Sequence, residues 1–160
     1  MKTLVRLLFT CVVALAALAA NSPVRPIFQL RLALDAPSGD AEQMVLVHKS
    51  GDAAQPERLY VQKKVLLDQT ALKSAKVIAD KRNGNPLIEI AFTAEGKERF
   101  AEVTRKNVGR RLAIVIEGRL YSAPSIRTEI PGGRAEISGS FSEPEAKELA
   151  AKINGSVTGR

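Results

Sequence analysis

The 160-residue sequence predicts an α+β domain, in which two amphipathic helices pack on one face of a mostly antiparallel sheet. Short segments with alternating apolar residues recur along the chain, and tight glycine turns join two pairs of them, as in antiparallel hairpins. Two longer segments, 93–108 and 142–153, instead repeat their apolar residues at the spacing of a helix. Strands and helices that do not alternate regularly are typical of the α+β class.

A cleaved secretory signal is expected at residues 1–19. Basic residues precede an apolar run that ends at Ala20, and small residues occupy the usual cleavage positions. Residues 20–26 contain two prolines and read as a linker. The run of 14 residues is short against the ~20 that span a bilayer, so an uncleaved membrane anchor is the minority alternative. A lipidated Cys11 is disfavoured because this cysteine lies inside the apolar run. The sequence thus predicts an exported protein of the periplasm or cell envelope.

The folded domain is expected over residues 27–153, followed by a mobile tail at 154–160. Its first half contains short strand candidates, a helical turn capped by Asp68 and a hairpin around Asn83-Gly84. The strand candidates lie at 27–34, 44–48 and 58–64, and the hairpin at 75–93. In the first strand the even-numbered apolar residues share one face, whereas Gln29 and Arg31 lie on the other.

A helix is expected to begin after Thr93, a preferred type of N-cap residue, and to end at Gly109 in the left-handed conformation. Its apolar face contains Phe100, Val103, Thr104 and Val108. The next strand, 112–116, is apolar at every position, which favours a central strand buried on both sides.

A glycine turn at 117–118 leads into a second hairpin arm, which Pro124 ends. A short strand follows at 135–138. Ser142 and Glu145 form a capping box for the last helix, whose apolar face is Ala146, Leu149, Ala150 and Ile153. Asn154-Gly155 is expected to end this helix.

No catalytic residue, metal site or cofactor site is predicted. His48 is the only histidine, and removal of the signal removes the only cysteine, so histidine-based nucleophilic catalysis lacks partners. The glycines at 132–133 lack the residues of a phosphate loop. With 22 basic against 17 acidic residues after cleavage, a weak contact with an anionic membrane surface is compatible with the charge. Nucleic acid is disfavoured because aromatic residues are few.

Residues 92–150 resemble the head subdomain of the first periplasmic domain of SecD, a membrane subunit of the bacterial protein-export machinery. The resemblance rests on motifs that follow one another in the family's order: Asn107-Val108-Gly109, Leu112 to Ile116, Gly118, Ser122-Ala123-Pro124, Gly132-Gly133 and Gly139-Ser140-Phe141 before an acidic-capped helix. Upstream, 28–34 and 59–77 resemble the family's entry strand and its strand-then-turn segment more loosely.

The resemblance implies a non-enzymatic domain that engages unfolded or emerging secretory polypeptide, or Sec and envelope proteins, on the outer side of the membrane. The family's membrane helices are not encoded in these residues, so no proton-driven transport is expected of them. The predicted partner surface is the hairpin arm, with Arg119, Tyr121, Ser122, Pro124 and Ile126. Reuse of the scaffold for another envelope protein or a lipid surface is the alternative, and an enzyme is the least favoured.

Overall fold

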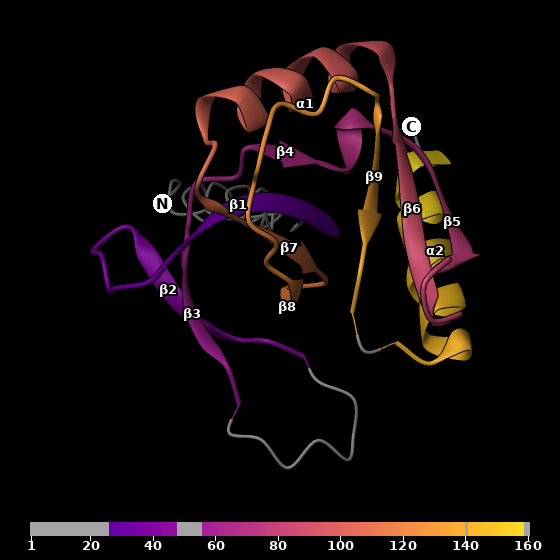
Figure 1. Cartoon of the computed structure of the whole chain (residues 1–160), viewed down its shortest axis with the longest axis horizontal. Coiled ribbons are helices and arrows are strands. Elements are labelled where there is room, and N and C mark those ends of the chain that lie inside the picture. The colour runs from indigo at the N-terminus through magenta and orange to yellow at the C-terminus, as the bar shows by residue number, and fades with distance from the viewer. Residues whose placement is uncertain (1–25, 48–55, 140, 159–160) are drawn as a thin grey trace, which may run out of the picture.

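The computed structural model describes residues 26–47, 56–139 and 141–158, which form strands and helices in the predicted α+β arrangement (Figure 1). The elements follow in the order β1 Phe28–Leu34, β2 Ala41–Val45, β3 Arg58–Gln62, β4 Leu67–Asp68, the 3₁₀ helix η1 Gln69–Ala71, β5 Leu72–Ala79, β6 Pro86–Phe92, α1 Ala94–Lys106, β7 Arg111–Ile116, β8 Arg119–Ser122, β9 Arg134–Ile137 and α2 Glu143–Thr158. The predicted signal, residues 20–25 of the linker and His48 lie outside the described residues.

The described strands form two antiparallel sheets, where the sequence suggested one. Sheet A has the order β2-β3-β1-β7-β8, and β4 also pairs with β1. Sheet B has the order β5-β6-β9. The split follows from the chain between β4 and β5, where Asp68 caps η1 as predicted by accepting a hydrogen bond from the Thr70 N–H, 2.9 Å away. This turn redirects the chain, so the hairpin β5-β6 starts a sheet of its own.

Sheet A curls until its two ends meet. Leu46, just after β2, bridges to Leu120 in β8, and the Val47 N–H donates to the Leu120 carbonyl oxygen over 2.8 Å. The inner side of the curl holds a small apolar cluster of Ala33, Leu59, Val61, Ala113, Val115, Leu120 and Ala123. Because this side is covered as well, β1 is buried on both faces, and Arg31, on the face opposite Phe28 and Leu30, is only 5% exposed.

The main core lies between the outer face of sheet A, sheet B and the helices. Its fully buried members include Phe28 in β1, Ile116 in β7, Ile88 in β6 and Ile153 in α2. β7 contributes to this core through its even-numbered residues and to the inner cluster through Ala113 and Val115. The prediction of a central strand buried on both sides is therefore confirmed.

Helix α1 begins and ends close to the predicted positions. Thr93 is its N-cap and accepts a hydrogen bond from the Gly96 N–H, 3.0 Å away, and Gly109 has the predicted positive φ of 85°. Phe100 and Thr104 are buried as expected. Val108 is 51% exposed, so its assignment to the apolar face is wrong, because the helix ends at Lys106 and Val108 lies beyond its last turn.

Helix α2 packs on β5 and β6 through the predicted residues Ala146, Leu149, Ala150 and Ile153, all of which are buried. The prediction that Asn154-Gly155 ends this helix is wrong, since α2 continues to Thr158 and includes most of the expected tail. Asn154 faces sheet B, where its side-chain amide bonds both backbone polar groups of Ala75. Among the described residues, no helix is long and apolar enough to cross a membrane.

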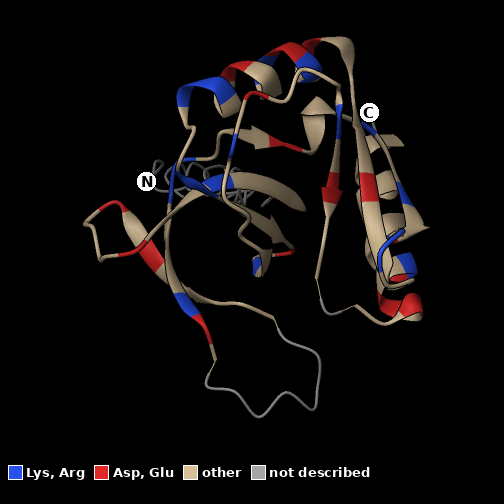
Figure 2. Ribbon diagram, in the orientation of Figure 1, with Lys and Arg blue, Asp and Glu red and all other residues tan. Residues whose placement is uncertain are grey.

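Positions of basic and acidic residues alternate along the ribbons of the helices and sheet B (Figure 2). On the outer face of sheet B, Glu89 in the middle strand pairs with Lys76 at 3.0 Å and with Arg134 at 2.9 Å. The two cations hold the pKa of the Glu89 carboxyl below its usual value, the hydrogen bond from Lys76 being the larger cause. These pairs join all three strands of the sheet at its solvent face.

Candidate partner-binding site

The structure divides the predicted partner surface between the core and the solvent. Arg119 and Pro124 are exposed and Ser122 is half-buried. Tyr121 and Ile126 are only 5% and 4% exposed and belong to the main core. These two residues must therefore be removed from the predicted surface, which is reduced to Arg119, Ser122 and Pro124.

The arm is fixed in place because its backbone continues to bond after β8 ends. The Ile126 N–H donates to the Arg110 carbonyl oxygen, and the Gly109 N–H donates to the Ile126 carbonyl oxygen, each over 2.8 Å. The Leu112 N–H likewise donates to the carbonyl oxygen of Pro124 over 2.8 Å. β8 ends at Ser122, before Pro124 as predicted, but these bonds hold residues 124–126 against the start of β7 and the two residues before it.

Tyr121 packs inward from this arm. Its ring stacks on Phe141 with 5.8 Å between centroids, and the Arg119 guanidinium lies 5.7 Å from the centre of the Tyr121 ring. Burial raises the pKa of the Tyr121 hydroxyl, and the nearby Arg119 cation partly opposes this effect. Tyr121 is thus an anchor of the arm rather than a contact for a partner.

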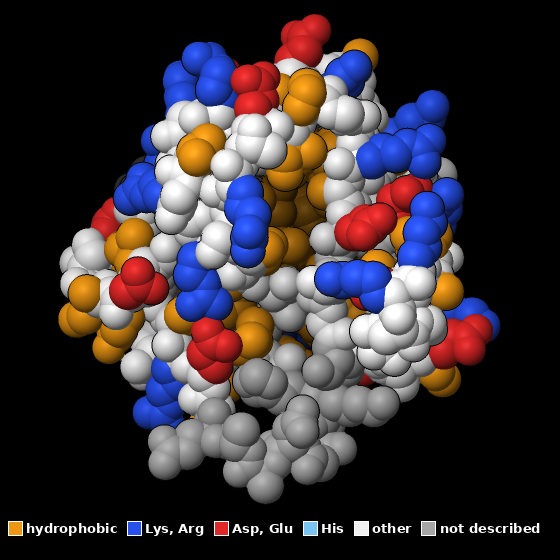
Figure 3. Space-filling view, in the orientation of Figure 1, with side chains coloured by type: hydrophobic (Ala, Val, Ile, Leu, Met, Phe, Trp, Pro, Cys, Tyr) orange, Lys and Arg blue, Asp and Glu red, His pale blue; other side chains and the backbone are white. Residues whose placement is uncertain are grey.

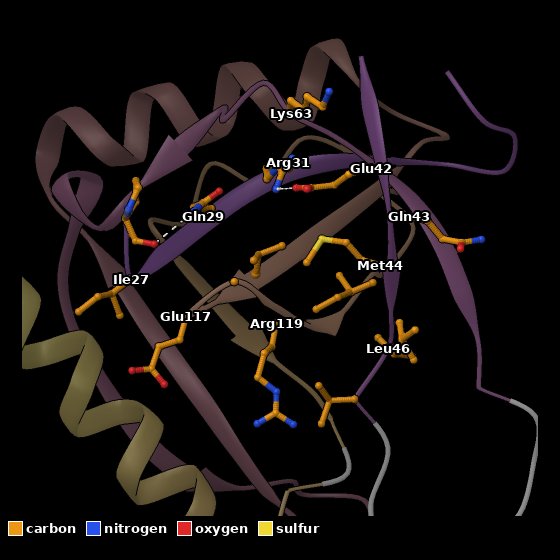
Figure 4. A pocket seen from close by; sticks show the side chains of 16 residues that line it. Ile27, Gln29, Arg31, Glu42, Gln43, Met44, Leu46, Lys63, Glu117 and Arg119 are labelled. Atoms are coloured by element: carbon orange, nitrogen blue, oxygen red, sulfur yellow. Dashed lines mark hydrogen bonds and ion pairs between the residues drawn. The ribbon is translucent and has the colours of Figure 1, made fainter. Parts of the chain in front are cut away.

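An open groove of about 1020 Å³ lies at the mouth of the curled sheet A, beside Arg119 (Figure 4). Its walls come from β1, β2 and the turn between β7 and β8. Apolar side chains reach it from Ile27, Met44 and Leu46, and the last two pack against the inner cluster of sheet A. The groove therefore exposes part of an apolar surface that the curl of the sheet does not close.

The turn between β7 and β8 places charged residues at the rim of the groove. Glu117 and Gly118 both have positive φ, 50° and 75°, as a two-residue hairpin turn requires. This geometry sets Glu117 and Arg119 on the groove side of the turn (Figure 4). Glu117 also accepts from Lys152 of α2 at 2.9 Å, and Glu148 pairs with the same ammonium at 2.9 Å. The two carboxylates raise the pKa of Lys152 above its ordinary value.

Arg31 and Glu42 form the polar part of the groove wall. The Arg31 guanidinium pairs with the Glu42 carboxylate at 2.7 Å and also donates to the carbonyl oxygen of Gln62. The Arg31 side chain is 6% exposed, whereas that of Glu42 is 49% exposed. The pair thus joins β1, β2 and β3 and leaves its carboxylate partly in contact with solvent.

Sequence reasoning missed this groove. Gln29 and Arg31 interrupt an otherwise apolar strand on the same side, and this polar stripe was the available signal. Nothing local indicates that β2 and β8 will meet across this stripe, so the sequence places Gln29 and Arg31 on one face of the strand without showing what lies over them. Of the five residues of the predicted partner surface, Arg119 lines the groove and the other four do not.

The groove is lined by apolar side chains together with charged groups. No group of three or more His, Cys, Asp or Glu side chains in the described part of the chain could hold a metal ion. The carboxylates that line the groove, Glu42 and Glu117, each pair with a cation. Apolar contacts with a charged rim are the features that such a site presents to a ligand.

These features define a small α+β domain with two antiparallel sheets, two helices and an open groove in one sheet. The chain belongs to the family of the SecDF P1 head subdomain, whose family model matches residues 43–157. The P1 head is a periplasmic domain of a membrane protein of the protein-translocation machinery. The predicted resemblance to the SecD head is therefore confirmed.

Related proteins support this assignment. The chain is 48% identical over 85 residues to the translocase subunit SecDF of Thermus thermophilus, and 47% identical over 85 residues to SecD of Sebaldella termitidis. Each match covers 53% of this chain, but only 11% and 21% of those proteins. SecD of Acidaminococcus fermentans matches over 111 residues with 35% identity, which is 69% of this chain and 26% of that protein. The chain thus spans a small part of these relatives.

Solved structures show the same fold. A SecDF structure, described as that of a membrane component that enhances protein export, superposes with a TM-score of 0.63 and 32% identity, covering 81% of this chain and 62% of that one. SecDF in a super-membrane-facing form gives a TM-score of 0.64 with 31% identity over 81% of this chain and 18% of that one. The α+β fold predicted from the sequence is thus that of the SecDF head.

Proposed function

We propose that this domain is a non-enzymatic polypeptide-binding module of protein export, and that extended segments of secretory polypeptide bind in the groove of sheet A. The observation that carries the proposal is the groove itself, an open channel whose apolar wall belongs to the inner cluster of the sheet. Membership of the SecDF P1 head family relates the chain to translocation. Export of the chain to the periplasm or cell envelope, as its N-terminal sequence predicts, is part of this proposal.

An unfolded polypeptide suits the groove for two reasons. Its size is at the upper end of ligand sites, which are commonly about 300–1,000 Å³, and its openness allows a chain to enter and leave sideways. Its wall combines apolar groups at Met44 and Leu46 with charges at the rim, so contacts do not depend on one particular side chain of the ligand. Weak contacts of this kind suit clients of varied sequence.

The proposal is tested by photocrosslinking. The protein, purified after export, carries p-benzoylphenylalanine in place of Arg119 at the groove or of Lys73, which is exposed on β5. A chemically unfolded secretory protein is expected to crosslink at position 119 and not at position 73. Binding of the wild type that is no stronger than that of a folded basic control protein of similar charge would contradict the proposal.

A pair of variants locates the contact. Met44→Ser removes an apolar side chain from the groove wall, whereas Val65→Ser removes a partly exposed apolar side chain outside it. Loss of most of one buried apolar contact, about 1.5 kcal/mol, is expected to weaken binding about tenfold for Met44→Ser. Val65→Ser should leave binding unchanged, and equal effects of the two would exclude the groove as the binding site.

A further inference from the structure

The edge strands of the two sheets differ in what pairs with their outer backbone groups. In sheet A the end strands meet through the Leu46–Leu120 bridge. In sheet B, the edge at β5 is occupied by Asn154 of α2, whose Oδ1 accepts from the Ala75 N–H and whose Nδ2 donates to the Ala75 carbonyl oxygen, each over 2.8 Å. The opposite edge, β9, pairs with β6 on one side and has no strand on its other side among the described residues.

The register identifies the backbone groups at this edge. The Phe92 N–H donates to the Gly133 carbonyl oxygen over 3.0 Å, and the same register pairs Ala135 with Ile90 and Ile137 with Ile88. Hydrogen-bonded and non-bonded pairs alternate in an antiparallel ladder, so Gly133, Ala135 and Ile137 bond to β6. The N–H and C=O groups of Arg134 and Glu136 then point away from β6.

The other edge of the sheet supports this assignment independently. Ile90 directs its backbone groups to β9, so its partner on the other side, Ala75, must direct its own groups away from the sheet. These are the groups that Asn154 bonds. One edge of sheet B is therefore occupied by a side-chain amide, while the equivalent groups of Arg134 and Glu136 point outward at the other edge.

A hollow lies along this edge. Figure 3 shows it between β9 and the segment that precedes this strand, with hydrophobic side chains on its floor. Ala135 in β9 and Ile130 in the preceding segment are partly buried members of the adjoining core. A strand placed beside β9 would direct alternate side chains into this hollow, because successive side chains of a strand point to opposite faces.

We propose that the β9 edge accepts an extended segment of another polypeptide as a fourth strand of sheet B, with apolar residues at every second position of that segment. This inference rests on the proposed function, since it assumes a polypeptide ligand, but it assigns a second contact away from the groove. Main-chain hydrogen bonds with Arg134 and Glu136 supply affinity that is independent of the ligand's sequence, and the hollow selects alternating apolar residues.

A second copy of the chain is a poorer occupant. Its own β9 would bring Arg134 and Glu136 on one face, while Ile137 on the other face is fully buried in its own core. Such a strand has no large apolar side chain to place in the hollow. An unfolded polypeptide can supply a large apolar side chain at every second position.

The test uses Glu136→Pro, with Glu136→Ala as its matched control. Proline removes the outward N–H of residue 136 without removing a bond to β6, whereas alanine removes only the side chain. The probe is a fluorescent peptide of about eight residues with alternating valine and threonine. Loss of one main-chain bond together with the clash of the proline ring is expected to weaken binding about tenfold for Glu136→Pro and not for Glu136→Ala. Equal binding by both variants would overturn the inference.

Crosslinking separates this inference from the groove. With p-benzoylphenylalanine in place of Ser138, just after β9, the wild type should crosslink to the peptide, and Glu136→Pro should lose that product while it keeps the one at position 119. Crosslinks at 119 alone would reject the edge site and retain the proposed function. Crosslinks at 138 alone would reject the groove and retain the edge.

Two further controls complete the test. If Glu136→Pro does not fold, as judged by its circular dichroism, the same peptide methylated at alternate backbone nitrogens is used with the wild type, and unchanged binding would overturn the inference. Sedimentation of the wild type without peptide is expected to show no β9-dependent dimer. A dimer that Glu136→Pro abolishes would make the second copy the occupant and refute the proposal.

Discussion

Replacement of Gly96 by alanine is expected to destabilise the protein, although alanine is the better helix former. Gly96 lies in the first turn of α1, where this helix crosses the end of η1. A Cβ atom on residue 96 would lie 2.1 Å from the carbonyl oxygen of Ala71 and 2.9 Å from its carbonyl carbon. Ordinary contacts begin at 3.4 Å, so α1 and η1 must separate by about 1 Å or more. The obstacle is backbone, and no side-chain rotation relieves it.

The magnitude follows from the contacts that the separation disturbs. The Ala71 carbonyl oxygen accepts from the Thr93 N–H at 2.9 Å and from the Thr93 hydroxyl at 3.3 Å, next to the N-cap of α1. Overpacking costs about 1–3 kcal/mol, and weakening one hydrogen bond costs about 1 kcal/mol. The higher helix propensity of alanine offsets this loss of stability by up to about 1 kcal/mol. The free energy of unfolding should therefore fall by about 1–3 kcal/mol.

Urea unfolding followed by circular dichroism measures this change through the midpoint at unchanged slope. Gly155→Ala is the matched control, because Gly155 lies in α2 and a Cβ there meets no atom within 4 Å. The free energy of unfolding of Gly155→Ala should rise by up to about 1 kcal/mol. A Gly96→Ala protein as stable as the wild type, alongside a stabilised Gly155→Ala protein, would refute the reasoning from close backbone approach.

Two other predictions concern Asn154 and Tyr121. Asn154→Ala removes both hydrogen bonds to the backbone of Ala75. The free energy of unfolding should fall by about 1–2 kcal/mol, a figure that already includes the higher helix propensity of alanine. Unchanged stability in urea would show that these two bonds do not stabilise the edge of β5. Burial raises the pKa of Tyr121 above its ordinary value of 10.0, so the unfolded protein loses the hydroxyl proton more readily than the folded protein does. The neutral hydroxyl therefore contributes fully to the free energy of unfolding below pH 10.0, and this contribution is lost as the pH rises through the raised pKa. Between about pH 9 and pH 11, wild-type stability should fall more than that of Tyr121→Phe, and parallel pH curves would contradict the assignment.

Local features of the fold were readable from the sequence because they depend on neighbours in the chain. The cap at Thr93, the positive φ of Gly109 and the turn at Glu117-Gly118 each follow from the backbone preferences and hydrogen bonds of a few successive residues. The ordered motifs between 92 and 150 identified the family for the same reason. Their spacing is a property of the chain, and the family model that matches residues 43–157 agrees with it.

The candidate site could be predicted only in part. Arg119 was correctly placed on the surface, but Tyr121 and Ile126 are core residues. Arg119 and Tyr121 are two residues apart and would share a face in a regular strand, but the pairing of β7 with β8 shifts register here, and the sequence does not show this shift. Phe141 stacks on Tyr121 from a segment about twenty residues away.

The sequence predicted most strands and helices, the caps at Asp68 and Thr93, the turn at Glu117-Gly118 and the family to which the chain belongs. It misplaced β2, expected at 44–48 and found at Ala41–Val45, and it missed the true end of α2. Tertiary contacts account for the division of the strands into two sheets, for the curl of sheet A, and for Asn154 bonding the edge of β5 instead of ending its helix. These outcomes depend on contacts between residues far apart in the chain, such as Leu46 with Leu120. The free energy of such a contact arises when two distant segments pair, so the sequence of either segment alone does not predict it.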